Sequence, residues 1–181
     1  MAIIDLRGWN EVSENTGEYR KLPAGGYVCR IVRAELGERY DRPQLYLYID
    51  IAEGEYAGYF KAQNRETWSN NAVFARYVYD ETTKKITSTL KGLLVCVEKS
   101  NPSFKLDLTK FDTNSLVGKL CGFTFGEREY IYKDAVRLTT EVRFPMAADR
   151  IRSGDFTVPP LKELSKEPPP VKDDEFSNMP F

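Results

Sequence analysis

Residues 45–51 show the clearest alternation of apolar and other side chains in the sequence. The apolar positions are Leu45, Leu47, Ile49 and Ile51. The positions between them hold Tyr46, Tyr48 and Asp50. Because successive side chains of a β-strand point to opposite faces, a period of two predicts a strand with one buried face. A β-strand with two tyrosines on its outward face is therefore the first element that we expect.

Four further strands are expected around this one. In chain order, the five are residues 27–36, 45–51, 59–62, 118–129 and 136–144. The first follows a turn at residues 22–26, and Gly54 and Gly58 supply turn chemistry before the third. The first three strands should form an antiparallel meander, and residues 130–135 should connect the last two as a hairpin. Residues 64–85 are polar, aromatic and non-periodic, which predicts a loop or a short helical excursion.

One amphipathic helix is expected between the third and fourth strands. Apolar residues recur at helical spacing over residues 86–99, Thr87 and Ser88 are available for capping, and Asn101 and Pro102 end the run. Five strands with a helix in this position are the layout of the OB-fold, a partly open Greek-key barrel. Its second and third strands and the connecting loops bind oligonucleotides or oligosaccharides.

The chain of 181 residues fits one ordinary domain with appendages. We expect an N-terminal arm at residues 1–21, an OB-fold-like domain at residues 22–151 and a tail at residues 152–181. The tail is rich in Pro, Lys and Glu. Such a composition does not bury enough apolar surface to offset the entropy of ordering, so the tail should be disordered.

The chain contains no histidine, which removes the usual general base near neutral pH and the commonest metal ligand. Its three cysteines, Cys29, Cys96 and Cys121, are widely spaced in apolar surroundings, which favours buried free thiols in a reducing compartment. We therefore expect no enzymatic activity, no metal and no cofactor.

The longest apolar stretch, residues 93–97, is far shorter than the roughly 20 residues of a membrane-spanning helix. Residues 1–7 lack the pattern of a signal peptide. The expected location is therefore the cytoplasm. The net charge is −1, and residues 149–181 carry five basic and seven acidic residues, so the excess of negative charge lies in the tail.

The outward tyrosines of the second strand, Tyr46 and Tyr48, could form a stacking platform for successive bases. The alternative is that the helix or the N-terminal arm covers them. Further rings and cations near the expected third strand extend the same mixture: Tyr59, Phe60, Lys61, Arg65 and Trp68. Candidate phosphate contacts are Arg30, Arg33, Arg39, Arg42 and Arg137.

The last residues combine an acidic cluster with apolar side chains, which could offer a carboxylate and a ring to a pocket rimmed by basic residues. The candidate partner-binding residues are Asp173, Asp174, Glu175, Phe176, Met179, Pro180 and Phe181. Because this segment is acidic, we expect it to recruit other proteins and not to bind DNA.

This segment resembles the acidic C-terminal tip of bacterial single-stranded DNA-binding proteins, which typically ends Asp-Asp-Asp-Ile-Pro-Phe after a Pro- or Gly-rich linker. Met179 stands in place of the Ile, and residues 176–178 are an additional spacer. The body, over residues 22 to 144, is similar to a family of phage-encoded single-stranded DNA-binding proteins from Gram-positive hosts, on residues 22–27, 53–58 and 116–119.

The resemblance implies a protein that coats and protects single-stranded DNA in replication or recombination, with little sequence preference, in the host cytoplasm if phage-encoded. Its C-terminal tip would recruit replication or recombination proteins. Two alternatives remain open: a protein-interaction module of phage origin, and an oligosaccharide-binding barrel. The sequence leaves the oligomeric state open, a homo-oligomer included.

Overall fold

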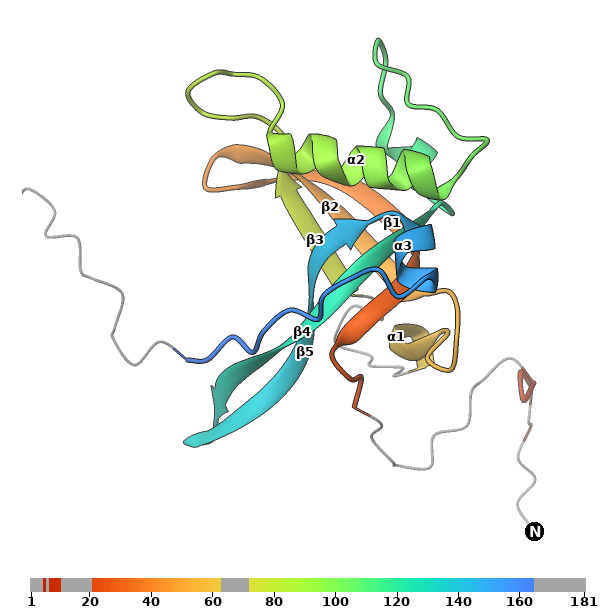
Figure 1. The fold of residues 1–181 in the computed structure, drawn as a ribbon, viewed down its shortest axis with the longest axis vertical. Helices are drawn as coiled ribbons and strands as arrows, with labels where there is room; N and C mark the ends of the chain where they lie inside the picture. The colour runs from red at the N-terminus through yellow and green to blue at the C-terminus, as the bar shows by residue number, and fades with distance from the viewer. Residues whose placement is uncertain (1–4, 6, 11–20, 63–71, 165–181) are drawn as a thin grey trace, which may run out of the picture.

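The computed structural model describes residues 5, 7–10, 21–62 and 72–164. Five strands form one antiparallel sheet in the order β3-β2-β1-β4-β5 (Figure 1). The strands are β1 (Gly25–Arg39), β2 (Arg42–Ile51), β3 (Ala72–Tyr77), β4 (Leu120–Tyr132) and β5 (Ala135–Met146). The helical elements are α1 (Tyr59–Ala62), α2 (Ser88–Ser100), the short 3-10 helix η1 (Thr113–Leu116) and α3 (Ala148–Arg152). The expected mainly-β fold, with a helix between the third and fourth strands, is confirmed.

The sheet curls until its two edge strands approach each other. β1 lies at the centre and pairs with both β2 and β4. At the edges, Nη2 of Arg76 in β3 donates a hydrogen bond to the carbonyl of Arg143 in β5, over 3.2 Å. Within the described strands, no ladder of backbone pairs joins β3 to β5. The sheet is therefore not closed, and the word barrel applies to it only loosely.

The third strand lies later in the chain than the sequence pattern predicted. Tyr59–Ala62 forms the short helix α1, and Ala72–Tyr77, inside the expected loop, forms β3. The helix is favoured because the buried carboxylate of Asp50 accepts hydrogen bonds from the backbone N–H groups of Phe60 (3.0 Å) and Lys61 (3.4 Å). An acceptor at this position satisfies donors that the first turn of a helix leaves unpaired.

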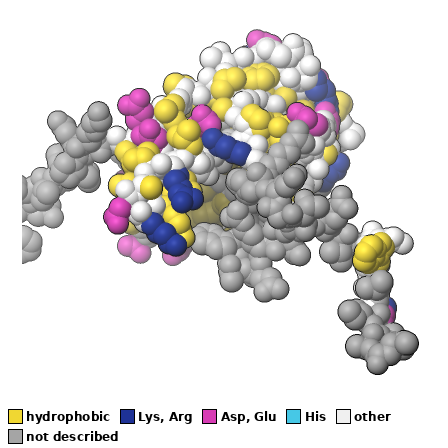
Figure 2. Space-filling view, turned by 90° about the horizontal axis from the view of Figure 1, so that it is seen from below, with side chains coloured by type: hydrophobic (Ala, Val, Ile, Leu, Met, Phe, Trp, Pro, Cys, Tyr) yellow, Lys and Arg dark blue, Asp and Glu magenta, His cyan; other side chains and the backbone are white. Residues whose placement is uncertain are grey.

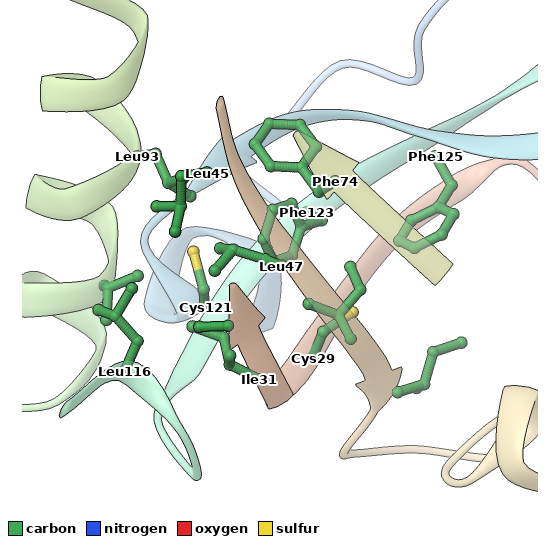
Figure 3. Packing of buried hydrophobic residues seen from close by; sticks show 14 of the residues in the cluster. Cys29, Ile31, Leu45, Leu47, Phe74, Leu93, Leu116, Cys121, Phe123 and Phe125 are labelled. Carbon is green, nitrogen blue, oxygen red and sulfur yellow. The ribbon is translucent and has the colours of Figure 1, made fainter. Parts of the chain in front are cut away.

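The hydrophobic core fills the space between the inner face of the sheet and α2 (Figure 3). Leu93 of α2 points toward Leu45 of β2, and the rings of Phe74 and Phe123 meet edge to face at 5.1 Å. The four apolar residues of β2 identified from the alternation are all buried: Leu45, Leu47, Ile49 and Ile51. The predicted inner face of this strand is confirmed.

Both ends of α2 are tied to the sheet. At the start, Oγ1 of Thr87 accepts from the backbone N–H of Leu90 (3.1 Å) and donates to the carbonyl of Tyr77 at the end of β3 (2.7 Å). At the other end, the amide of Asn101 donates to the carbonyl of Leu120 and accepts from its N–H. The predicted helix and its capping residue are confirmed.

Residues 159–164, which we call the strap, lie along β4. Lys162 donates its N–H to the carbonyl of Glu127 and accepts from the N–H of Glu129, both over 3.0 Å. Pro159 is buried against Gly126. The strap takes the place that β1 leaves free, since β1 pairs with β4 only up to Phe125. The segment expected to be a disordered tail from residue 152 therefore begins with residues bound to the sheet, and residues 165–181 lie outside the described part.

Among the described residues, no helix has the length and apolar character required to cross a membrane.

Candidate nucleic-acid interface

The outer face of β1, β2 and β3 carries three tyrosines, and we call it the tyrosine face. Its residues lie in three rows across the strands: Arg33, Tyr48 and Val73; Glu35, Tyr46 and Ala75; Gly37, Gln44 and Tyr77. Residues opposite one another in an antiparallel pair share a face of the sheet. The register therefore places the three rings on one surface, with two of them on the same strand and the third on its neighbour.

Tyr48 and Arg33 form a stacked pair. The guanidinium carbon of Arg33 lies 3.8 Å from the centroid of the Tyr48 ring, and its Nη1 makes an ion pair with Glu35 at 3.2 Å. A cation over an aromatic face is attracted by the negative charge density of the ring. The guanidinium thus covers one face of the Tyr48 ring.

Tyr46 lies against the backbone of β1. A Cβ atom built on Gly37 would come within 3.0 Å of Cε2 of the Tyr46 ring. The absence of a side chain at Gly37 therefore lets the ring rest close to the strand. The Tyr46 side chain is half-buried in this position, and so is Tyr48, while the strand keeps both on the outward face.

Tyr77 is a member of the face that sequence reasoning missed. The guanidinium carbon of Arg42 lies 4.0 Å from its ring centroid, so this pair repeats the arrangement of Arg33 and Tyr48. Nε of Arg42 lies 3.1 Å from a Glu81 oxygen in an ion pair without hydrogen-bond geometry. The signal that the sequence offers is the residue types Val73, Phe74 and Tyr77, which are favoured in strands.

The structure brings four of the five predicted arginines to the face of Tyr46 and Tyr48. By the strand register, these are Arg30, Arg33, Arg39 and Arg42. Nη1 of Arg30 donates to the carbonyl of Gly118 over 3.1 Å, and the guanidinium carbon of the exposed Arg39 lies 5.2 Å from the centroid of the neighbouring Tyr40 ring. On the surface of the molecule seen from below, hydrophobic, basic and acidic side chains lie interspersed (Figure 2). A face with rings and cations together suits a ligand that is both flat and anionic.

The rings of α1 are not brought to this face. The hydroxyl of Tyr59 accepts from the N–H of Leu22 over 3.1 Å, and Phe60 stacks on Phe125 with ring centroids 6.1 Å apart. Both side chains pack against the core and are only partly exposed. Lys61 is exposed on the same helix. The sequence pattern grouped these residues with the tyrosines because it treated them as a strand.

The remaining candidates lie elsewhere. Arg137 belongs to the projecting hairpin of β4 and β5, where it lies over the Tyr132 ring at 5.0 Å (Figure 1). The predicted contacts Arg65 and Trp68 lie outside the described residues. The same holds for all of the predicted partner-binding residues: Asp173, Asp174, Glu175, Phe176, Met179, Pro180 and Phe181.

Arg76 is a second residue that sequence reasoning missed. It lies at the open seam between β3 and β5, half-buried, with its guanidinium 3.8 Å from the centroid of the Phe74 ring. Burial lowers the pKa of this guanidinium from its ordinary value. Its hydrogen bond to Arg143 shows that it helps to hold the two edges together.

Within the described ranges, no group of three or more Cys, Asp or Glu residues is placed to hold a metal ion. In the comparisons with known proteins, no family model and no curated protein matches the chain.

Proposed function

We propose that the chain is a non-enzymatic single-stranded DNA-binding protein whose tyrosine face stacks successive bases while its arginines follow the phosphates. The observation that carries the proposal is the register of β1, β2 and β3. It aligns Tyr46, Tyr48 and Tyr77 on one face, with guanidinium groups stacked on two of the rings.

The energies allow a base to replace a guanidinium over each ring. A cation over a ring contributes about 0.5 to 1 kcal/mol at an exposed site and about 2 kcal/mol where the pair is desolvated. Stacking of a base on an aromatic side chain contributes about 1 to 3 kcal/mol. A guanidinium displaced from Tyr48 or Tyr77 then becomes available to a phosphate. Because every base has a flat face, such binding has little sequence preference and depends strongly on salt.

In this proposal, the protein coats and protects single-stranded DNA in replication or recombination in the cytoplasm. Residues 173–181 recruit other proteins. This division of labour is supported by charge, since the acidic residues are concentrated near the end of the chain.

The first test removes both tyrosines of β2. For the variant Tyr46→Ala/Tyr48→Ala, we expect affinity for a fluorescent thymidine oligomer to fall more than tenfold at fixed salt, since 1.4 kcal/mol is one decade. The matched control is Tyr130→Ala/Tyr132→Ala, which removes two tyrosines at the same spacing from β4. Its affinity should stay within about twofold of the wild type. Equal affinities of the wild type and the β2 variant, with intact circular dichroism, would remove these rings from the site.

The second test measures salt dependence. If about four arginines contact phosphates, the logarithm of affinity should fall with the logarithm of salt concentration at a slope of about −3, using about 0.7 per contact for single strands. Fluorescence anisotropy at several salt concentrations gives this slope. No binding of thymidine homopolymers at low ionic strength would end the proposal.

A second candidate function, protein interaction, is favoured by the projecting hairpin. Ile131 and Val136 face each other across β4 and β5 and are 65% and 62% exposed, and Leu138 lies on the same face. Exposed apolar residues in one cluster are typical of protein interfaces. In this alternative, Ile131→Glu would abolish partner binding, while the oligonucleotide would not bind to either variant or wild type.

A further inference from the structure

A separate apolar pocket lies on the side of the sheet opposite to the tyrosine face. We call it the α2 pocket; its volume is about 460 Å³. It lies between the last part of β1, the first part of β2, the first half of α2 and residues 106–113. The lining includes Leu36, Leu45, Ile86, Leu94, Leu108 and Phe111. Leu36 and Leu45 alternate with the residues of the tyrosine face, so they point to the other side of the sheet.

Several apolar side chains at this pocket are exposed to solvent. Leu36 is 65% exposed, Ile86 52% and Leu108 90%. Phe111 and Tyr79 at the same pocket are also exposed. Single exposed apolar residues are common on proteins, whereas a contiguous group around a hollow marks a surface that another group covers.

Lysines adjoin several lining residues along the chain: Lys85 precedes Ile86, Lys91 follows Leu90, Lys105 precedes Leu106 and Lys110 precedes Phe111. Residues 84–110 contain six lysines (Lys84, Lys85, Lys91, Lys99, Lys105, Lys110) and two acidic residues (Glu98, Asp107). Of the two acidic residues, Glu98 lies 3.8 Å from Lys105. Asp107 lines the pocket, and its carboxylate accepts from the N–H groups of Thr109 and Lys110. The surroundings of the pocket therefore favour an occupant with negative charge next to apolar side chains.

We propose that the occupant is the segment 173–181 of the same chain. Asp173, Asp174 and Glu175 supply the negative charge, and Phe176, Met179 and Phe181 supply the apolar side chains. The rings enter the pocket while the carboxylates lie among the lysines.

The connecting chain is long enough. Leu164 is the last described residue, and Phe181 lies 17 positions after it in the chain. At about 3.3 Å per residue, this length spans about 56 Å. A domain of about 150 residues has a radius of gyration of about 15 Å, so the segment can reach any part of its own surface.

Docking in this pocket leaves the tyrosine face free. Docking of residues 173–181 in the α2 pocket does not depend on DNA binding at the tyrosine face, so each can be tested without the other. It also gives the segment a place to shelter its apolar side chains when no partner protein is present.

The test uses the full chain with Phe181→p-benzoylphenylalanine, a photo-reactive analogue of the same ring. After irradiation, mass spectrometry should locate the cross-link on residues 86–111. In a mixture of isotopically labelled and unlabelled protein, the cross-linked peptides should carry a single label, because both ends belong to one chain. Saturating thymidine oligomer should leave the yield unchanged.

Two further variants decide whether the pocket is responsible. Leu108→Glu places a negative charge at the pocket on a side chain that is 90% exposed, so folding should be preserved and the cross-link should fall at least fivefold. Ile131→Glu makes the same change at an exposed residue of the β4–β5 hairpin and should leave the yield as it is. Cross-links on the tyrosine face, cross-links only between copies, no cross-link at all, or an unchanged yield in Leu108→Glu would each overturn the proposal.

Discussion

Asp50 connects two elements through its buried carboxylate. It lies on the outward side of β2, as the alternation predicts, yet it is only 8% exposed because α1 lies beside it. Its Oδ1 accepts from the backbone N–H groups of Ile51 (2.8 Å) and Phe60 (3.0 Å), and its Oδ2 from that of Lys61 (3.4 Å). One side chain thus sets where β2 ends and where α1 begins.

Asp50→Ala should lower the free energy of unfolding by about 1 to 3 kcal/mol, because it leaves buried N–H groups without an acceptor. Asp50→Asn keeps one acceptor oxygen and should lose about half as much. Urea denaturation followed by circular dichroism measures both. Asp155→Ala, which removes only an exposed ion pair with Arg150, serves as the control and should cost less than about 1 kcal/mol. Equal losses at positions 50 and 155 would contradict the capping role.

The cysteines should differ in reactivity. Burial raises the pKa of Cys29 and Cys121 above the ordinary value. The pKa of Cys96, which is half-buried, is raised for the same reason. Since the thiolate is the reactive form, a raised pKa means less thiolate at a given pH. Iodoacetamide at pH 8 should modify Cys96 slowly and spare the other two until denaturant is added. Intact mass measured over time checks this, and rapid addition of three adducts would be the contrary result.

Among the elements, α2 depends on Thr87, whose hydroxyl caps the helix and also bonds to β3. Thr87→Ala should cost about 1 to 2 kcal/mol of stability, since it removes both hydrogen bonds. Ser88→Ala changes the next residue, whose side chain has no described hydrogen bond, and should cost less than about 0.5 kcal/mol. Thermal denaturation of the two variants compares them. A similar loss in both would show that the cap contributes little.

The elements also show where sequence reasoning succeeds and where it fails. The alternation in residues 45–51 is local, so the inner face of β2 could be predicted. β3 has six residues, and its inward positions include the charged Arg76, so the apolar period is too short to recognise. The helical state of Tyr59–Ala62 depends on a carboxylate contributed from β2. Tyr77 was not included in the predicted site because β3, the strand that carries it, was not predicted.

At the scale of the whole molecule, residues 155–164, which include the strap, are bound to the sheet. Phe156 packs on Gly26, Pro159 on Gly126, and Lys162 pairs with β4. A chain ending at residue 154 should therefore lose about 3 kcal/mol of stability, from about two backbone hydrogen bonds and one half-buried ring. A chain ending at residue 164 should unfold at the same urea concentration as the full chain. Equal stability of both truncated chains would show that the strap is dispensable.

The same truncated chains separate stability from ligand binding. The chain ending at residue 164 should bind thymidine oligomers with equal or slightly higher affinity than the full chain, because the acidic segment cannot hold an anion. Titration at fixed salt measures this. A large loss of affinity would place part of the binding surface in residues 165–181.

The position of the strap has a consequence for solubility. β1 begins at Gly25, opposite Phe125, so the N–H and C=O groups of β4 near Glu127 and Glu129 would face water if Lys162 did not pair with them. Unpaired strand edges recruit strands from other molecules and begin fibrils. A chain that ends at residue 154 should therefore form thioflavin-positive aggregates, whereas a chain that ends at residue 164 should not, because residues 155–164 protect this edge from pairing with other molecules.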